Sequence, residues 1–153
     1  MARLSDLPSA TQKVLQELEC PSFERRPFVS GPPLERRRIA LVSTAGLVRR
    51  GEKPFLAGEG DYRAIPAGTP ARDLLMTHVS VNFDRTGFQR DLNTVLPVDR
   101  LNELAAQGTI GSVATRHYAF MGASEPKAME VNARALATLL LGDKVDGVVL
   151  VPV

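Results

Sequence analysis

The chain has 153 residues, of which 44% are hydrophobic and 24% are charged, a composition typical of one globular domain that excludes a disordered or fibrous protein. Its longest apolar run, residues 148–153, is far too short to cross a membrane, and the charged, proline-containing N-terminus lacks the apolar stretch of a signal peptide. The net charge is only +2, and no RNA- or DNA-binding signature accompanies the arginine clusters at 25–26, 36–38 and 49–50, so we expect neither nucleic acid nor a membrane as partner.

The first 35 residues are predicted to form a helix followed by a proline-rich connector. Apolar residues recur at the spacing of one helical face between residues 5 and 19, and Cys20-Pro21 ends the pattern. Further prolines keep the connector irregular, because proline removes a backbone donor and restricts the residue before it. Cys20 is the single cysteine of the chain, so no intrachain disulfide can form, and we expect a reducing, cytoplasmic location.

The next part of the chain is predicted to contribute the first strands of a sheet. The apolar run at residues 38–44 closes with a glycine and is typical of a strand buried on both faces. Residues 46–76 are rich in glycine and proline, which predicts a long irregular segment with one short strand at 62–65. Residues 77–83 alternate polar and apolar residues with period two, which predicts a second core strand.

The second half of the chain alternates helices and strands. Residues 97–108 begin with proline, repeat leucines on one face and end at glycine, which predicts a short helix. Residues 110–120 contain β-forming residues and predict a third core strand. A capping serine and a proline near the first turn open a helix at residues 124–141, and the apolar run within 145–153 predicts a last buried strand.

Together these elements predict one α/β domain over residues 36–153, with an open, mostly parallel sheet and flanking helices in a three-layer plan of the Rossmann or flavodoxin type. The helix at 124–141 is expected to turn four apolar side chains to the sheet, namely Ala128, Val131, Ala135 and Leu139. A buried parallel strand normally leads into a crossover helix. We therefore expect the sheet to be incomplete after Val153 and its edge to be prone to association.

The candidate binding residues follow from where open α/β sheets bind ligands, at the carboxyl ends of strands. Hydroxyl, titratable, amide and guanidinium groups gather near these predicted ends. The candidates for substrate binding are Ser43, Thr44, Gly46, His78, Asn82, Asp84, Arg85 and His117. Each also has a structural interpretation: a strand-to-loop turn for the first three, hydrogen-bonded sheet residues for the histidines, and a pair or a turn cap for Asp84 and Arg85.

Motifs of the commoner catalytic and cofactor sites are missing. Two widely separated histidines and one cysteine do not make a metal-site spacing. Gly58-Glu59-Gly60 lacks the third glycine of a dinucleotide-binding loop, and no Gly-x-Ser-x-Gly elbow of a serine hydrolase occurs. We therefore expect no metal and no nucleotide cofactor in this chain.

An ordered set of segments resembles the selenoprotein B subunits of the glycine, sarcosine, betaine and D-proline reductases. The segments are residues 38–47, 78–87, 91–97, 100–104, 108–112 and 145–153. The resemblance implies reductive cleavage of a carbon–nitrogen bond in a small amino-acid-like substrate, with a selenolate or thiolate as nucleophile. It also implies an oligomer, a dithiol electron donor and a partner subunit that carries a pyruvoyl group.

In that family the nucleophile lies on the loop directly after a strand like residues 148–153, shortly before one or more further cysteines. The following helix turns the positive end of its dipole to this loop, which favours the ionised nucleophile. This chain contains no selenocysteine, and Cys20 lies before the core. We therefore expect no catalytic residue within the chain, place the selenocysteine just after Val153, and interpret the end of the chain as a UGA codon read as stop.

Two other functions stay open. One is a non-catalytic binding or assembly module that keeps the strand-end residues and lacks the nucleophile. The other is a racemase-like enzyme on a related α/β plan, although that chemistry commonly uses two opposed cysteines at strand ends, and Cys20 is alone and misplaced for it.

Overall fold

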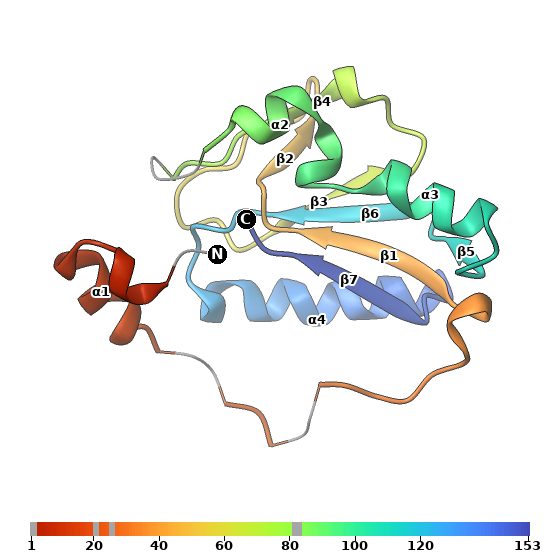
Figure 1. Cartoon of the computed structure of the whole chain (residues 1–153), viewed down its shortest axis with the longest axis horizontal. Helices are drawn as coiled ribbons and strands as arrows, with labels where there is room; N and C mark the ends of the chain where they lie inside the picture. The colour runs from red at the N-terminus through yellow and green to blue at the C-terminus, as the bar shows by residue number, and fades with distance from the viewer. Residues whose placement is uncertain (1–2, 20–21, 25–26, 81–83) are drawn as a thin grey trace.

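The sheet is built around β1 (Arg38–Ser43), whose residues are buried from Ile39 onward in the computed structural model. The structure describes residues 3–19, 22–24, 27–80 and 84–153. β6 (Arg116–Phe120) and β7 (Gly147–Val151) flank β1, and both run parallel to it. β3 (Tyr62–Pro66) lies outside β6 and is antiparallel, while β5 (Ser112–Val113) pairs with the start of β1. The predicted open, mostly parallel sheet is confirmed (Figure 1).

Helices cover both faces of this sheet. α4 (Pro126–Gly142) packs on one face, where Leu136 joins a cluster with Val42, Tyr118 and Phe120. α3 (Val98–Ala106) lies on the other face, and its Leu101 belongs to the larger core cluster. Figure 1 shows β1, β6 and β7 between these two helices. The apolar core thus sits in two layers, one on each side of β1.

A smaller antiparallel sheet and short helical turns complete the domain. β2 (Leu47–Arg49) pairs with β4 (Leu74–Met76), and α2 (Thr86–Arg90) lies near this small sheet. The 3-10 turns are Leu4–Asp6, Leu34–Arg36, Ala71–Asp73 and Leu92–Thr94. None of the helices in the described part of the chain combines the length and the hydropathy needed to span a membrane.

The N-terminal helix is shorter than predicted and makes little contact with the rest of the chain. α1 covers Ser9–Gln16 and has no buried residue. Leu7, the residue before Pro8, is extended and separates α1 from the turn at Leu4–Asp6, because the residue before a proline avoids helical angles. An ion pair between Lys127 and Glu19 (2.8 Å) joins the segment after α1 to α4. The division of the chain at residue 35 stays a prediction.

Two predicted strands are wrong in extent. The strand expected at 77–83 does not form over residues 77–80, and residues 81–83 lie outside the described part; the observed strand, β4, ends at Met76. The Thr77 amide donates to the Gly46 carbonyl (2.9 Å), which continues the β2–β4 pairing by one hydrogen bond, and the Thr77 hydroxyl donates to the same carbonyl (3.0 Å). The strand expected at 110–120 is divided into β5 and β6.

The predicted sheet-facing side of α4 is also wrong. Val131 is 77% exposed and Leu139 is 47% exposed, whereas Met129, Leu136 and Leu140 pack against the sheet. The buried stripe is therefore displaced by one residue, about 100° around the helix. In this orientation the Asn132 amide also donates to the Gly60 carbonyl (3.1 Å) of a neighbouring loop.

Candidate substrate-binding site at the strand ends

The carboxyl ends of β1, β6 and β7 meet around Thr44. The Thr44 amide donates to the Val151 carbonyl (3.1 Å), and the Thr44 hydroxyl accepts from the Val153 amide (2.8 Å). On the other side, the Gly122 amide donates to the Thr44 carbonyl (2.8 Å). Thr44 thus ties together the ends of the three parallel strands. We define the strand-end cluster as Thr44, Gly46, His78, Gly122 and Val153.

Gly46 lets another segment pass close to the end of β1. Its φ is +63°, a left-handed conformation that favours glycine. A Cβ at this position would lie 3.0 Å from both the Cα and the amide nitrogen of His78. The backbone of His78 can therefore approach the end of β1 only because residue 46 has no side chain.

Gly122 is a member of the cluster that the sequence did not single out. A Cβ at Gly122 would lie 2.7 Å from the Val153 carbonyl oxygen, 2.8 Å from the Thr44 carbonyl oxygen and 3.1 Å from His78 Nε2. Two carbonyl oxygens and an imidazole nitrogen thus converge on one exposed glycine. Its signal in the sequence is its place directly after the apolar end of a predicted strand.

The His78 ring is buried and neutral at neutral pH. The residue is 6% exposed, and its Nδ1 accepts a hydrogen bond from the Ser80 amide (3.2 Å). With Nδ1 as acceptor, the neutral ring carries its proton on Nε2, the atom directed at Gly122. Burial, and secondly the Arg85 guanidinium, lower the pKa of His78 below its ordinary value, because both disfavour the charged ring.

Arg85 and Asp84 hold the backbone beside the cluster. The Arg85 guanidinium donates to the carbonyls of His78 (2.6 Å) and Ser80 (3.3 Å). The exposed Asp84 carboxylate accepts from the amide and the hydroxyl of Thr86 (both 2.9 Å) at the start of α2, and these hydrogen bonds lower the pKa of Asp84. Asn82 lies outside the described residues. Arg85 is thus next to the cluster, and Asp84 caps a turn.

Ser43 and His117 are buried inside the sheet. The Ser43 hydroxyl accepts from the Ala45 amide (3.2 Å), an interaction that stabilises the turn after β1. His117 lies near the start of β6, and its Nδ1 accepts from the Leu41 amide (3.1 Å). Burial lowers the pKa of His117 to about 4. The structure therefore brings Thr44, Gly46 and His78 together and leaves His117 apart; the binding roles of all of them stay predictions.

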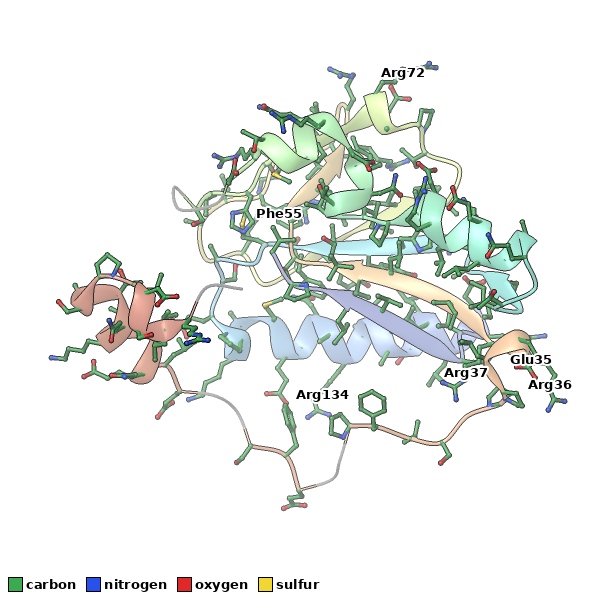
Figure 2. All side chains as sticks on the ribbon, in the orientation of Figure 1. Glu35, Arg36, Arg37, Phe55, Arg72 and Arg134 are labelled. Atoms are coloured by element: carbon green, nitrogen blue, oxygen red, sulfur yellow. The ribbon has the colours of Figure 1, made fainter. Side chains whose placement is uncertain are left out.

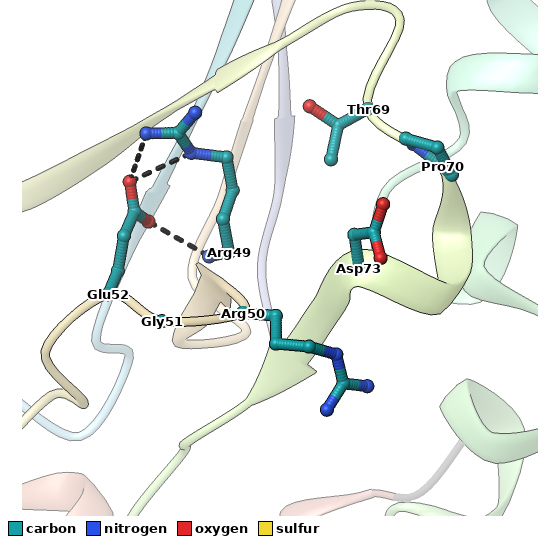
Figure 3. Close-up of a pocket in the computed structure, with 7 residues that line it drawn as sticks. All are labelled: Arg49, Arg50, Gly51, Glu52, Thr69, Pro70 and Asp73. Atoms are coloured by element: carbon teal, nitrogen blue, oxygen red, sulfur yellow. Dashed lines mark hydrogen bonds and ion pairs between the residues drawn. The ribbon is translucent and has the colours of Figure 1, made fainter.

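A separate open depression of about 620 Å³ lies beside β2 and β4 (Figure 3). Its two arginines and Glu52 already have partners in the chain. The Arg49 guanidinium pairs with the Glu52 carboxylate, and the Arg50 guanidinium donates to the Arg72 carbonyl (3.0 Å). Figure 2 shows Arg36, Arg72 and Arg134 on separate parts of the surface, so these arginines do not gather on one face. The strand-end cluster remains the better candidate site.

The described residues hold no group of three or more His, Cys, Asp or Glu side chains that could bind a metal ion. The chemistry that the cluster can offer is instead a hydrogen-bond donor from a neutral imidazole next to two carbonyl acceptors. Such a pair of opposite polarities suits a small molecule with both an anionic and a cationic end.

Comparison with known proteins places the chain among reductase subunits. A D-proline reductase subunit gamma from Acetoanaerobium sticklandii is 31% identical over 120 residues, which cover 76% of this chain and 49% of that protein. A glycine reductase complex component B subunit gamma from Symbiobacterium thermophilum is 32% identical over 145 residues, 88% of this chain and 33% of that protein. The corresponding subunit from Carboxydothermus hydrogenoformans is 30% identical over 141 residues, 88% of this chain and 32% of that protein.

The chain thus spans between a third and a half of the length of these curated relatives. No solved structure matches it. The family model described as glycine/sarcosine/betaine reductase selenoprotein B matches residues 10–153, which is nearly the whole chain. The predicted resemblance is confirmed: the protein belongs to the glycine/sarcosine/betaine reductase selenoprotein B family.

Proposed function

We propose that the protein supplies the substrate-binding scaffold of a selenol- or thiol-dependent reductase subunit, which cleaves the C–N bond of glycine, betaine, sarcosine or a D-proline-like substrate. The observation that carries the proposal is the convergence of Thr44, His78 and Gly122 at the ends of parallel strands, where open α/β sheets bind ligands. The names of the relatives, D-proline reductase and glycine reductase, support the substrate class.

The polarity of the cluster supports an amino-acid-like ligand. The Nε2 proton of neutral His78 suits a carboxylate, and the carbonyl oxygens of Thr44 and Val153 suit a protonated or N-methylated nitrogen. These groups bind and orient the substrate. The chain itself provides no nucleophile there, because Cys20 is its single cysteine and lies far before β1 in the sequence.

We place the nucleophile on the loop that follows a strand equivalent to β7. There it forms a bond to the substrate carbon as the C–N bond breaks, and the nitrogen leaves with the bonding electrons and takes a proton. The bond between the nucleophile and the carbon is then cleaved by a dithiol, which supplies two electrons and becomes a disulfide, while the carbon takes a proton and the selenol or thiol is restored. A pyruvoyl-bearing partner subunit, an oligomeric assembly and a cytoplasmic location complete the proposal.

Ligand binding by the chain tests the substrate part of this proposal. Isothermal titration with glycine, betaine, sarcosine and D-proline is expected to detect binding of at least one of them at millimolar concentration or below, roughly −4 kcal/mol or stronger. His78→Ala should remove this binding, whereas His117→Asn, which changes the histidine outside the cluster, should keep it. If none of the four compounds binds, the proposed substrate class is wrong.

A second candidate function is a non-catalytic binding or assembly module, which is supported by the lack of cysteine in the strand-end cluster. Binding of one of the four compounds by the chain without turnover is the result expected for such a module.

A further inference from the structure

Arg85 directs its charge at backbone carbonyls. Its guanidinium donates to the His78 carbonyl (2.6 Å) and the Ser80 carbonyl (3.3 Å). No carboxylate within residues 3–19, 22–24, 27–80 and 84–153 forms an ion pair with it. The positive charge of Arg85 is therefore not neutralised by a described acidic residue, and it lies beside the backbone of a buried histidine.

The two bonds hold the segment that also orients the imidazole. The Ser80 amide donates to His78 Nδ1 (3.2 Å), while the Ser80 carbonyl accepts from Arg85. Loss of the Arg85 bonds to the carbonyls at residues 78 and 80 is expected to loosen the position of the Ser80 amide opposite Nδ1. The position of the Nε2 proton depends on that amide, because a neutral imidazole places its proton on the nitrogen that does not accept.

Arg85 and the Ser80 amide act on the ring in the same direction. The amide bond to Nδ1 requires an unprotonated Nδ1, and the nearby guanidinium disfavours a second positive charge. Among the described residues, Arg85 is the charged group that lowers the pKa of His78. Both contacts thus select the neutral ring with its proton on Nε2, which is the atom near Gly122 and the carbonyls of Thr44 and Val153.

We propose that Arg85 is a positioning residue for His78: it contacts no substrate and instead fixes the neutral imidazole, proton on Nε2, at the strand ends. The role of His78 toward a substrate carboxylate rests on the proposed function above. The arrangement of the ring by Arg85 rests on the contacts themselves. The two can therefore fail separately.

Histidine NMR provides a test that needs no activity. The chain has two histidines, so two-bond ¹H–¹⁵N spectra contain two imidazole patterns, and His117→Asn assigns them. In the wild-type chain we expect His78 as the neutral Nε2-protonated form at pH 7. In Arg85→Ala the pKa of His78 should rise toward its ordinary value, and part of the proton should move to Nδ1. Arg85→Lys keeps the charge but not the forked donor, so its pKa should lie between the two.

Arg90→Ala is the matched control, because Arg90 is an exposed arginine at the end of α2, five residues from Arg85. It should leave the His78 pattern unchanged. If a folded Arg85→Ala variant, judged by an unchanged His117 pattern, keeps the wild-type pKa and proton position of His78, the inference is wrong. Where one of the four compounds binds the wild type, Arg85→Ala should weaken that binding about tenfold, because binding must then reorder the ring. Failure of all four to bind the wild type counts only against the proposed function.

Discussion

Acidification should destabilise the fold through His117, a residue outside the candidate site. His117 is fully buried in β6, and its Nδ1 accepts the hydrogen bond of the Leu41 amide. Because β5 pairs with β1 at Ile39 and β6 pairs with it at Val42, the imidazole takes the place of a backbone acceptor between the two strands. Protonation of Nδ1 would remove this acceptor and leave a charge in the core.

The sign and size of the effect follow from the pKa of the ring. Burial lowers the pKa of His117 from 6.5 to about 4, so between these values the unfolded chain binds a proton that the folded chain does not. Above pH 6.5 the ring is neutral in both states and costs no stability. The free energy of unfolding falls as the pH drops from 6.5 toward 4. The loss is roughly 2 kcal/mol between pH 7 and 4.5 and about 3 kcal/mol below pH 4.

Urea unfolding at pH 7, 6, 5 and 4.5 measures this dependence. His117→Asn is the informative variant, because the Asn oxygen can accept from the Leu41 amide and does not titrate. It should lose the His117 part of the slope, whereas His78→Asn should keep it. Glu52 and Asp143, whose pKa values are lowered in the fold, add their own loss of stability as the pH falls to about 4.5 and below. His117→Asn keeps these carboxylates, so the difference between its slope and that of the wild type isolates the His117 part. A His117→Asn slope equal to that of the wild type would refute the reasoning.

The remaining predictions concern packing and association. Gly122→Ala places a Cβ against two strand-end carbonyls and should lower the free energy of unfolding by roughly 1–3 kcal/mol in urea denaturation. Gly60→Ala would bring a Cβ against a carbonyl oxygen of α4 and should lower the free energy of unfolding at least as much. Gly68→Ala has open space around the new Cβ and should change the free energy of unfolding by less than about 0.5 kcal/mol. Leu150 is 72% exposed on β7, so the chain should self-associate in sedimentation velocity experiments. Leu150→Lys should reduce this association, and the control Leu104→Lys should not. Equal behaviour of the two variants would exclude β7 as the contact surface.

The candidate site could be predicted in part. Thr44 and Gly46 lie at the end of β1, which the apolar run at residues 38–44 predicts. The rule that ligands bind at strand ends was therefore enough to select them. His78 was selected from a strand that does not form, and it reaches the site through the close approach at Gly46. Gly122 could not be selected, since its importance lies in the atoms of distant residues that surround it.

The sequence by itself determined the elements with strong local signals and the family. β1, β7 and α3 were predicted from apolar runs and from proline and glycine at helix ends, because these signals act within one turn or one strand. The predicted burial of β7 is wrong, since Val148, Val149 and Leu150 are exposed. Only the tertiary structure decided the rotation of α4 and the place of His117. α4 carries two adjacent apolar stripes, and periodicity cannot tell which one is buried. In the fold Leu136 packs against the sheet, Val131 is exposed to solvent, and Asn132 contacts the loop at Gly60.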